Sequence, residues 1–196
     1  MTDKKFEMTN KKYILTNQAF KIDGRPLYRI KAIRDFEDVK AGDLGGFIEK
    51  EDNLSHDGDA WVCGDALVYD NAQVYGNAQV CGNARVCGSA WVYGNARVCG
   101  DARVYGYARV CGDALVYGNA NILWASKIGS RFGTTTVFEN KDGGISVSCG
   151  CFFGTLEEFE KKVEEMHGNN KYGREYKVLI ELIKIHFGLE KITDEK

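Results

Sequence analysis

From residue 59 to residue 123 the chain reads DAWVCG DALVYD NAQVYG NAQVCG NARVCG SAWVYG NARVCG DARVYG YARVCG DALVYG NANIL. Alanine recurs every six residues from Ala60, and valine, with one isoleucine, recurs two positions later. A period of six spreads apolar residues around a helix, whereas a strand keeps residues two apart on one side. Glycine followed by asparagine or aspartate favours a sharp corner, because these residues readily adopt left-handed backbone angles. The repeat therefore predicts short strands joined by corners.

Three such strands would close one coil of about 18 residues, and stacked coils would hydrogen-bond about 4.8 Å apart. Small alanine and branched valine side chains suit a narrow interior. The pattern resembles the hexapeptide-repeat family, whose fold is a left-handed parallel β-helix. One difference is that tyrosine or cysteine, rather than glycine, directly follows the aliphatic residue here. The resemblance implies the architecture and leaves the function open, because one fold hosts many functions.

The chain as a whole is expected to be mainly β and to have three parts. The repeat extends backward with Leu54 in the alanine position and His56 in the valine position, and forward to Ile128. Asp23-Gly24 is a strong hairpin signal near the N-terminus. The expected parts are an N-terminal β-hairpin and cap (1–53), the hexapeptide β-helix (54–129) and a C-terminal α+β domain of a hairpin and two helices (130–196).

The two C-terminal helices have separate signals. Thr155 and Glu158 form a capping box for the first helix, and Gly168 ends it. The second helix is expected from about Arg174 to Phe187 and is apolar over most of its circumference. We therefore expect it either to be sandwiched within the C-terminal domain or to be shared with another subunit.

The flanks carry a second resemblance. The stretches LYRIKAIRDFEDVKAGDLGGFIEKEDNLS, at 27–55, and TTTVFENKDGGISVSCGCFFGTLEEFEKKVEEMHGNNKYGREYKVLIELIKIHFG, at 134–188, resemble an uncharacterised family of phage and prophage proteins. Members of that family wrap the same kind of repeat. The resemblance implies a viral or mobile-element setting inside a bacterial host, and it carries over no catalytic residue.

Residues 18 apart stack on one outer face of such a coil. One face is expected to align Tyr69, Cys87, Tyr105 and Leu123 beside Leu67, Arg85 and Arg103. Exposed patches rich in Trp, Tyr and Arg are typical of interfaces. Side-chain ladders that only stabilise the coil remain the alternative interpretation. The residues that we expect to bind a partner are Trp61, Tyr69, Arg85, Trp91, Arg97, Arg103, Tyr105 and Arg109.

Composition narrows the functional classes. The 196 residues have a formal net charge of −2, so direct nucleic-acid binding through a basic surface is not expected. No apolar run is long enough for a membrane helix, and the charged N-terminus does not resemble a signal peptide. We therefore expect a cytoplasmic protein with free thiols, including those of the stacked cysteines. The chain has three histidines and one C-x-C pair, Cys149-Gly-Cys151, without a second pair, so a metal site is not expected.

These patterns favour a binding protein over an enzyme. We expect no catalytic residue and no cofactor. The leading hypothesis is a phage or prophage homo-oligomer, trimer or dimer, that blocks a host protein or nucleoprotein complex of a bacterial defence system, like an anti-CRISPR. One alternative is a hexapeptide-class acyltransferase that uses acyl-CoA with His56 as its base. Another is a sponge that sequesters a nucleotide between subunits, with Arg85 and Arg103 on the phosphate.

Overall fold

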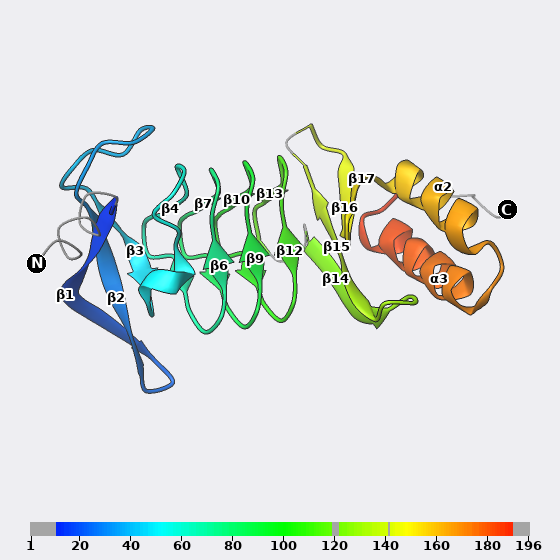
Figure 1. The fold of residues 1–196 in the computed structure, drawn as a ribbon, viewed down its shortest axis with the longest axis horizontal. Helices are drawn as coiled ribbons and strands as arrows, with labels where there is room; N and C mark the ends of the chain where they lie inside the picture. The colour runs from blue at the N-terminus through cyan, green and yellow to red at the C-terminus, as the bar shows by residue number, and fades with distance from the viewer. Residues whose placement is uncertain (1–10, 119–121, 141, 190–196) are drawn as a thin grey trace, which may run out of the picture.

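The computed structural model describes residues 11–118, 122–140 and 142–189. A stack of coils forms the middle of the elongated molecule, and the N-terminal hairpin and the two C-terminal helices lie at its opposite ends (Figure 1). The strands of the stack are β4 (Trp61–Val62), β5 (Leu67–Val68), β6 (Gln73–Val74), β7 (Gln79–Val80), β8 (Arg85–Val86), β9 (Trp91–Val92), β10 (Arg97–Val98), β11 (Arg103–Val104), β12 (Arg109–Val110) and β13 (Leu115–Val116). The predicted β-solenoid is thereby confirmed.

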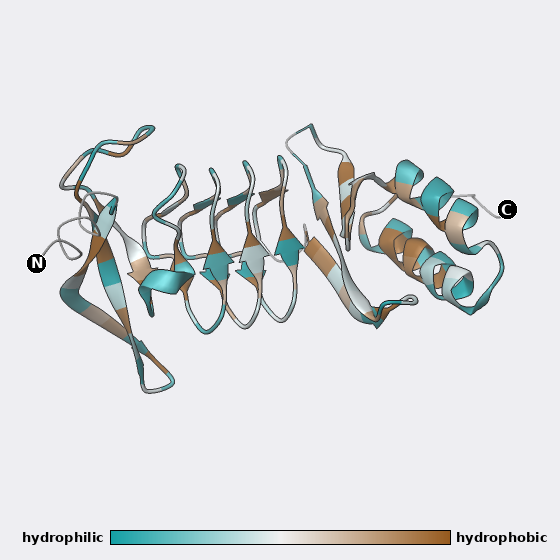
Figure 2. Ribbon diagram, viewed as in Figure 1, coloured by the Kyte–Doolittle hydropathy of each residue, from teal (hydrophilic) through white to brown (hydrophobic). Residues whose placement is uncertain are grey.

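Parallel pairing of every third strand builds the walls of the solenoid. The strand orders are β4-β7-β10-β13, β6-β9-β12 and β5-β8-β11, each in register with its neighbours. The repeated alanines and valines from Ala60 to Val116 point inward and are at most 2 % exposed. Figure 2 shows hydrophilic and hydrophobic residues alternating around the coils. The period of six therefore produces a continuous apolar interior.

The corners need residues that tolerate positive φ. Gly94 has φ +73°, and a Cβ there would lie 2.9 Å from the backbone nitrogen of Gly112 on the next coil. Asp70 stands where the repeat lacks glycine, and it adopts φ +59°. Its carboxylate accepts hydrogen bonds from the Gly88 N–H and from the Arg25 guanidinium. These bonds hold the aspartate in an otherwise glycine-like corner.

The N-terminal cap continues one wall of the solenoid. Strand β3 (Leu44–Ile48) pairs in parallel with β5, and on its other edge it pairs with the hairpin of β1 (Tyr13–Ile22) and β2 (Arg25–Ala32). Asp23 and Gly24 form the predicted turn, with φ values of 48° and 82°. A 3₁₀ turn, η1 (Glu51–Asn53), then leads into the first coil.

The register at the start of the solenoid differs from the expected one. Leu54 bridges to Val74, 20 residues on, and so occupies a valine level rather than the alanine level of a strict 18-residue repeat. His56 does not fill a valine position; its ring stacks on Tyr13 with 4.3 Å between centroids. The η1 turn accounts for the shift. Within it, the buried Asn53 side chain donates hydrogen bonds to the carbonyl oxygens of Asp70 and Ala72.

At the other end, the regular coils end with β13 rather than near residue 129. Strand β14 pairs antiparallel with β15, so its residues belong to the C-terminal sheet. The predicted hairpin around residues 141–144 is formed by β15 and β16, and a further strand follows it. The sheet comprises β14 (Ile122–Ile128), β15 (Gly133–Glu139), β16 (Ile145–Cys149) and β17 (Phe152–Thr155).

Two helices pack beside this sheet. Helix α2 (Leu156–His167) has the predicted capping box between Thr155 and Glu158, and it ends at Gly168. Helix α3 (Lys171–His186) begins three residues earlier than expected, because the Asn170 side chain accepts a hydrogen bond from the Gly173 N–H. Together the helices and the sheet enclose a second core, separate from that of the solenoid.

The expectation of free thiols along the solenoid is wrong for one pair. Cys63 and Cys81, on neighbouring coils, form a disulfide with 4.7 Å between their Cα atoms. That separation lies within the range that a disulfide tolerates. Both residues follow their two-residue strands, where the chain already turns, so the side chains are not held parallel as in a long strand. The other five cysteines, all of them in described parts of the chain, are free.

Candidate functional site

The solenoid walls separate the eight residues expected to bind a partner. Trp61 and Arg97 belong to the wall of β4, β7, β10 and β13, whereas Trp91 and Arg109 belong to that of β6, β9 and β12. The wall of β5, β8 and β11 carries the remaining residues, Tyr69, Arg85, Arg103 and Tyr105. Only on this third wall do four of the expected residues meet at one hollow.

We call this hollow the arginine–tyrosine pocket. Its volume is about 530 Å³, and it is lined by Tyr69, Arg85, Cys87, Arg103, Tyr105, Ile122 and Trp124. Strands β8 and β11 supply the two arginines, and β14 supplies Ile122 and Trp124. The pocket therefore forms where the solenoid meets the C-terminal sheet.

The two arginines are strand neighbours. Arg85 and Arg103 pair in register across β8 and β11, so one guanidinium group follows the other along the solenoid axis. Both side chains are exposed. On the N-terminal side the same row continues with Leu67, which pairs with Arg85 and is buried. The positive charge of the row is thus confined to the part that lines the pocket.

Aromatic rings form the remaining walls of the pocket. The Tyr105 ring is half exposed and meets Trp124 edge to face, with 4.5 Å between centroids. Tyr69 is partly buried, and burial, reinforced by a hydrogen bond with Cys87, raises the pKa of its phenol to about 12. Tyr69 therefore stays neutral at physiological pH. The lining of the pocket thus combines two positively charged arginine side chains with uncharged aromatic rings.

Sequence reasoning missed Trp124 and misplaced its neighbour. Leu123 was expected on this face, yet it packs against the C-terminal core, and Trp124 lines the pocket instead. The cause is the departure of β14 from the coil. A signal for it does exist in the sequence, because position 124 is a glycine position of the repeat and tryptophan occupies it.

The other expected residues lie in different surroundings. Trp61 is only 6 % exposed and packs edge-on against Phe36 of the N-terminal cap, so its ring is covered. Arg97 lines a separate depression together with Glu37, Asp59 and Asp113. The Arg109 guanidinium lies over the Trp91 ring, 4.8 Å from its centroid.

The wall of β6, β9 and β12 fits the side-chain ladder interpretation. Tyr75 and Tyr93 stack with parallel rings 4.9 Å apart, and Trp91 meets Tyr75 edge to face. Such stacking of like on like stabilises neighbouring strands. Because the Arg109 guanidinium covers the Trp91 ring, part of the aromatic surface of this wall is already in contact with the protein's own side chains.

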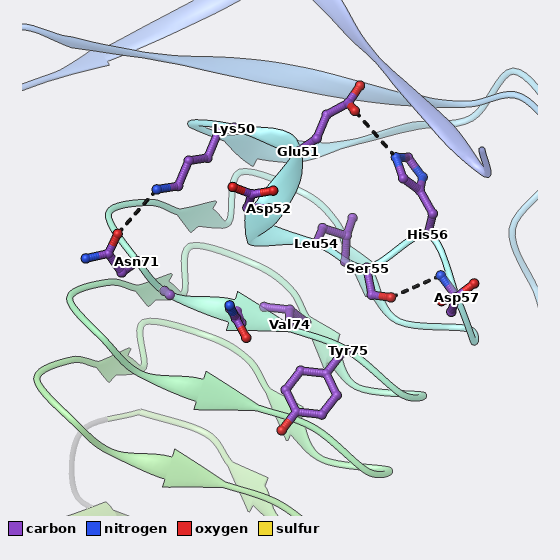
Figure 3. A pocket seen from close by; sticks show the side chains of 12 residues that line it. Lys50, Glu51, Asp52, Leu54, Ser55, His56, Asp57, Asn71, Val74 and Tyr75 are labelled. Carbon is purple, nitrogen blue, oxygen red and sulfur yellow. Dashed lines mark hydrogen bonds and ion pairs between the residues drawn. The ribbon is translucent and has the colours of Figure 1, made fainter. Parts of the chain in front are cut away.

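A larger, more open depression of about 760 Å³ lies beside the η1 turn (Figure 3). His56 is among its lining residues, and Glu51 lies 3.9 Å from the His56 Nε2. The His56 Nδ1 accepts a hydrogen bond from the Lys12 N–H, while Nε2 is buried without a hydrogen bond. Burial lowers the pKa of His56 below its usual value. Neither ring nitrogen is presented to a substrate as a base.

Two kinds of site are absent from the described residues. Among them, no group of three or more His, Cys, Asp or Glu side chains is arranged to hold a metal ion. No helix in the described part of the chain has the length and apolar character required to cross a membrane.

Comparison with known proteins identifies the repeat. A family model described as the YdcK β-solenoid repeat matches residues 60–76, 78–94, 96–111 and 108–121. These matches cover the solenoid and leave both flanks outside. No curated protein matches the chain. The chain is accordingly a β-solenoid repeat protein, and its family match names a repeat rather than an activity.

Proposed function

We propose that this protein is a non-catalytic binding protein that acts by direct contact, with the arginine–tyrosine pocket as the centre of its contact surface. The observation that carries the proposal is the meeting of Arg85, Arg103 and Tyr105 with Trp124 in one hollow. Arginine, tyrosine and tryptophan are the residues that most often dominate binding energy at protein interfaces. A pocket lined by them is suited to a projecting side chain of a partner protein.

The surroundings of His56 favour contact over acyl transfer. A hexapeptide-class acyltransferase would need an accessible base, and the nearest histidine to the solenoid is His56. Its Nδ1 is occupied by the Lys12 N–H, and its Nε2 is buried. We therefore place acyl transfer second, and binding of acyl-CoA with turnover that depends on His56 would reverse the order.

The more specific proposal is that the partner is a host protein or nucleoprotein complex of a bacterial defence system. It rests on the resemblance of residues 27–55 and 134–188 to phage and prophage proteins, which implies action in the bacterial cytoplasm. In that setting a protein without catalytic machinery can act by occluding its target. Recognition of a protein surface, rather than of nucleic acid directly, agrees with the net charge of −2.

Tagged protein captured from a bacterial host lysate tests the proposal. We expect one host protein to be recovered in stoichiometric amount, and to form the same complex when both components are purified. Arg85→Ala and Arg103→Ala should each weaken that complex at least about tenfold, as loss of an anchor residue does. Arg131→Ala is the matched control, because it removes the same kind of exposed side chain outside the pocket. If all three variants bind the partner with the affinity of the wild type, the pocket is not part of the interface.

A further inference from the structure

The arginine–tyrosine pocket brings two like charges together on a rigid wall. Arg85 and Arg103 are in-register partners on β8 and β11, so their strands are about 4.8 Å apart. Like charges directly opposite each other on neighbouring strands are unfavourable, and an anion bound by both guanidinium groups would relieve this. Each guanidinium can donate two parallel hydrogen bonds, which match the oxygens of a phosphate. The wall thus has the donors that a phosphate group requires.

An acidic residue close to this wall, Asp70, has partners of its own. Asp70 follows Tyr69 in the chain, and its carboxylate bonds the Arg25 guanidinium and the Gly88 N–H. It is thereby held in the corner of its coil. The Tyr69 phenol, whose pKa is raised by burial, adds no negative charge to the pocket. Arg85 and Arg103 are the charged residues among those that line the pocket.

A flat ring also fits this pocket. Tyr105 is half exposed and is held edge to face against Trp124. All nucleobases can stack on such aromatic side chains, because every base has a π face. The buried Ile122 and the half-buried Cys87 are the other lining residues. A volume of about 530 Å³ lies in the range of pockets that hold small organic ligands.

We propose that the arginine–tyrosine pocket binds a nucleoside phosphate, with its phosphate on Arg85 and Arg103 and its base against Tyr105. We assign the site to the seven lining residues of a single chain. The nucleotide site suggested by the sequence would instead lie between subunits. This inference does not require a protein partner, and a bound nucleotide would occupy the same surface that we assign to partner contact.

Isothermal titration calorimetry separates the two halves of the proposed ligand. The probes are adenosine monophosphate and guanosine monophosphate, with ribose 5-phosphate lacking the base and adenosine lacking the phosphate. We expect both nucleotides to bind and each truncated probe to bind at least about tenfold more weakly, because each loses one set of contacts. No heat of binding from either nucleotide at millimolar concentration would overturn the proposal. Equal binding of adenosine monophosphate and ribose 5-phosphate would overturn the assignment of the base.

Substitutions then locate the site. Arg85→Ala and Tyr105→Ala should each weaken adenosine monophosphate binding at least about tenfold, whereas Arg131→Ala, at an exposed arginine outside the pocket, should leave it unchanged. Arg85→Lys keeps the charge and loses the bidentate geometry, so its affinity should lie between those of the wild type and Arg85→Ala. A thermal melt of each variant checks that it is folded. Unchanged binding in a folded Arg85→Ala variant would contradict the site.

The outcomes for the nucleotide and for the protein partner are distinguishable. Capture of a host protein without any binding of the nucleotides would refute this inference and leave the proposed function standing. Nucleotide binding without capture of a host protein would do the reverse, and the protein would then act by sequestering the nucleotide. If both bind, adenosine monophosphate should compete with the captured protein.

Discussion

The ammonium group of Lys12 donates a 2.6 Å hydrogen bond to the carbonyl oxygen of Ala60. The carbonyl oxygen of Gly58 is a second acceptor, at 3.2 Å. Elsewhere in the stack the equivalent carbonyls accept from the preceding coil, as the oxygen of Ala78 accepts from the Trp61 N–H. The first regular coil has no such neighbour on its β4 wall, whereas β3 and Leu54 precede it on the other two. A fully buried lysine therefore replaces the missing backbone donors at this end of the solenoid.

Replacement of Lys12 by methionine should destabilise the protein. The change keeps most of the apolar stem but leaves the carbonyls of Gly58 and Ala60 without their donor. An unsatisfied buried polar group costs about 1–3 kcal/mol, and we expect the free energy of unfolding at pH 7 to fall by that amount. Urea denaturation followed by circular dichroism measures it. Lys11→Met is the control, since Lys11 forms only an exposed ion pair with Glu51 and should change stability little.

The same lysine should give the stability of the protein a pH dependence. Burial lowers the pKa of Lys12 from 10.5 to about 8 in the folded protein. Between these values the unfolded chain binds more protons, so this group makes the free energy of unfolding rise with pH. Burial raises the pKa of Tyr13, which has the opposite effect above about pH 10. The difference between wild type and Lys12→Met should therefore widen from pH 8 to pH 10, and a constant difference would contradict the shifted pKa.

A methyl group at a stacked corner should weaken the solenoid. Gly94 has φ +73°, and a Cβ there would lie 2.9 Å from the Gly112 nitrogen, closer than real contacts allow. Gly94→Ala combines that clash with an unfavourable backbone angle, and we expect a loss of roughly 1–3 kcal/mol. Gly133→Ala is the matched control, because its φ is ordinary and no atom lies within 4 Å. Equal urea midpoints for the two variants would contradict a tight corner.

The sequence predicts the parts of the fold that depend on residues close together in the chain. Alanine and valine at a period of six leave the strand as the only structure that keeps both on one side. The capping box at Thr155 needs only residues three apart, and the structure contains it. The register predicted for Leu54 was wrong. The observed register depends on the η1 turn, whose buried Asn53 donates a hydrogen bond to the next coil.

The candidate site was predicted only in part for a related reason. Stacking at a separation of 18 residues correctly placed Arg85 beside Arg103, because strand pairing sets that contact. Trp124 comes from the sheet that caps the stack, and its position depends on pairing between β14 and β15, which no repeat specifies. Trp61 and Trp91 occupy the same position of the six-residue repeat. Trp61 is nevertheless buried, because it contacts the N-terminal cap.

The outer face of helix α3 is apolar, and no residue in the described part of the chain covers it. The helix is not sandwiched, because its inner side packs on the C-terminal core while Val178, Leu182 and Ile185 are 72 %, 48 % and 61 % exposed. Their spacing of four and then three residues is that of helices which pair with one another. We therefore propose that the protein forms a homo-oligomer, dimer or trimer, and that this stripe is its interface.

Leu182→Lys should convert that oligomer to a monomer, because it places a charge in the centre of the stripe, where burial of a lysine is unfavourable. Size-exclusion chromatography with light scattering gives the mass of each form. Glu181→Lys is the control, since it introduces the same side chain next to the stripe at a position that is already exposed and charged. A wild-type protein that is monomeric at high concentration would refute self-association. An oligomer that survives in Leu182→Lys would place its interface elsewhere on the chain.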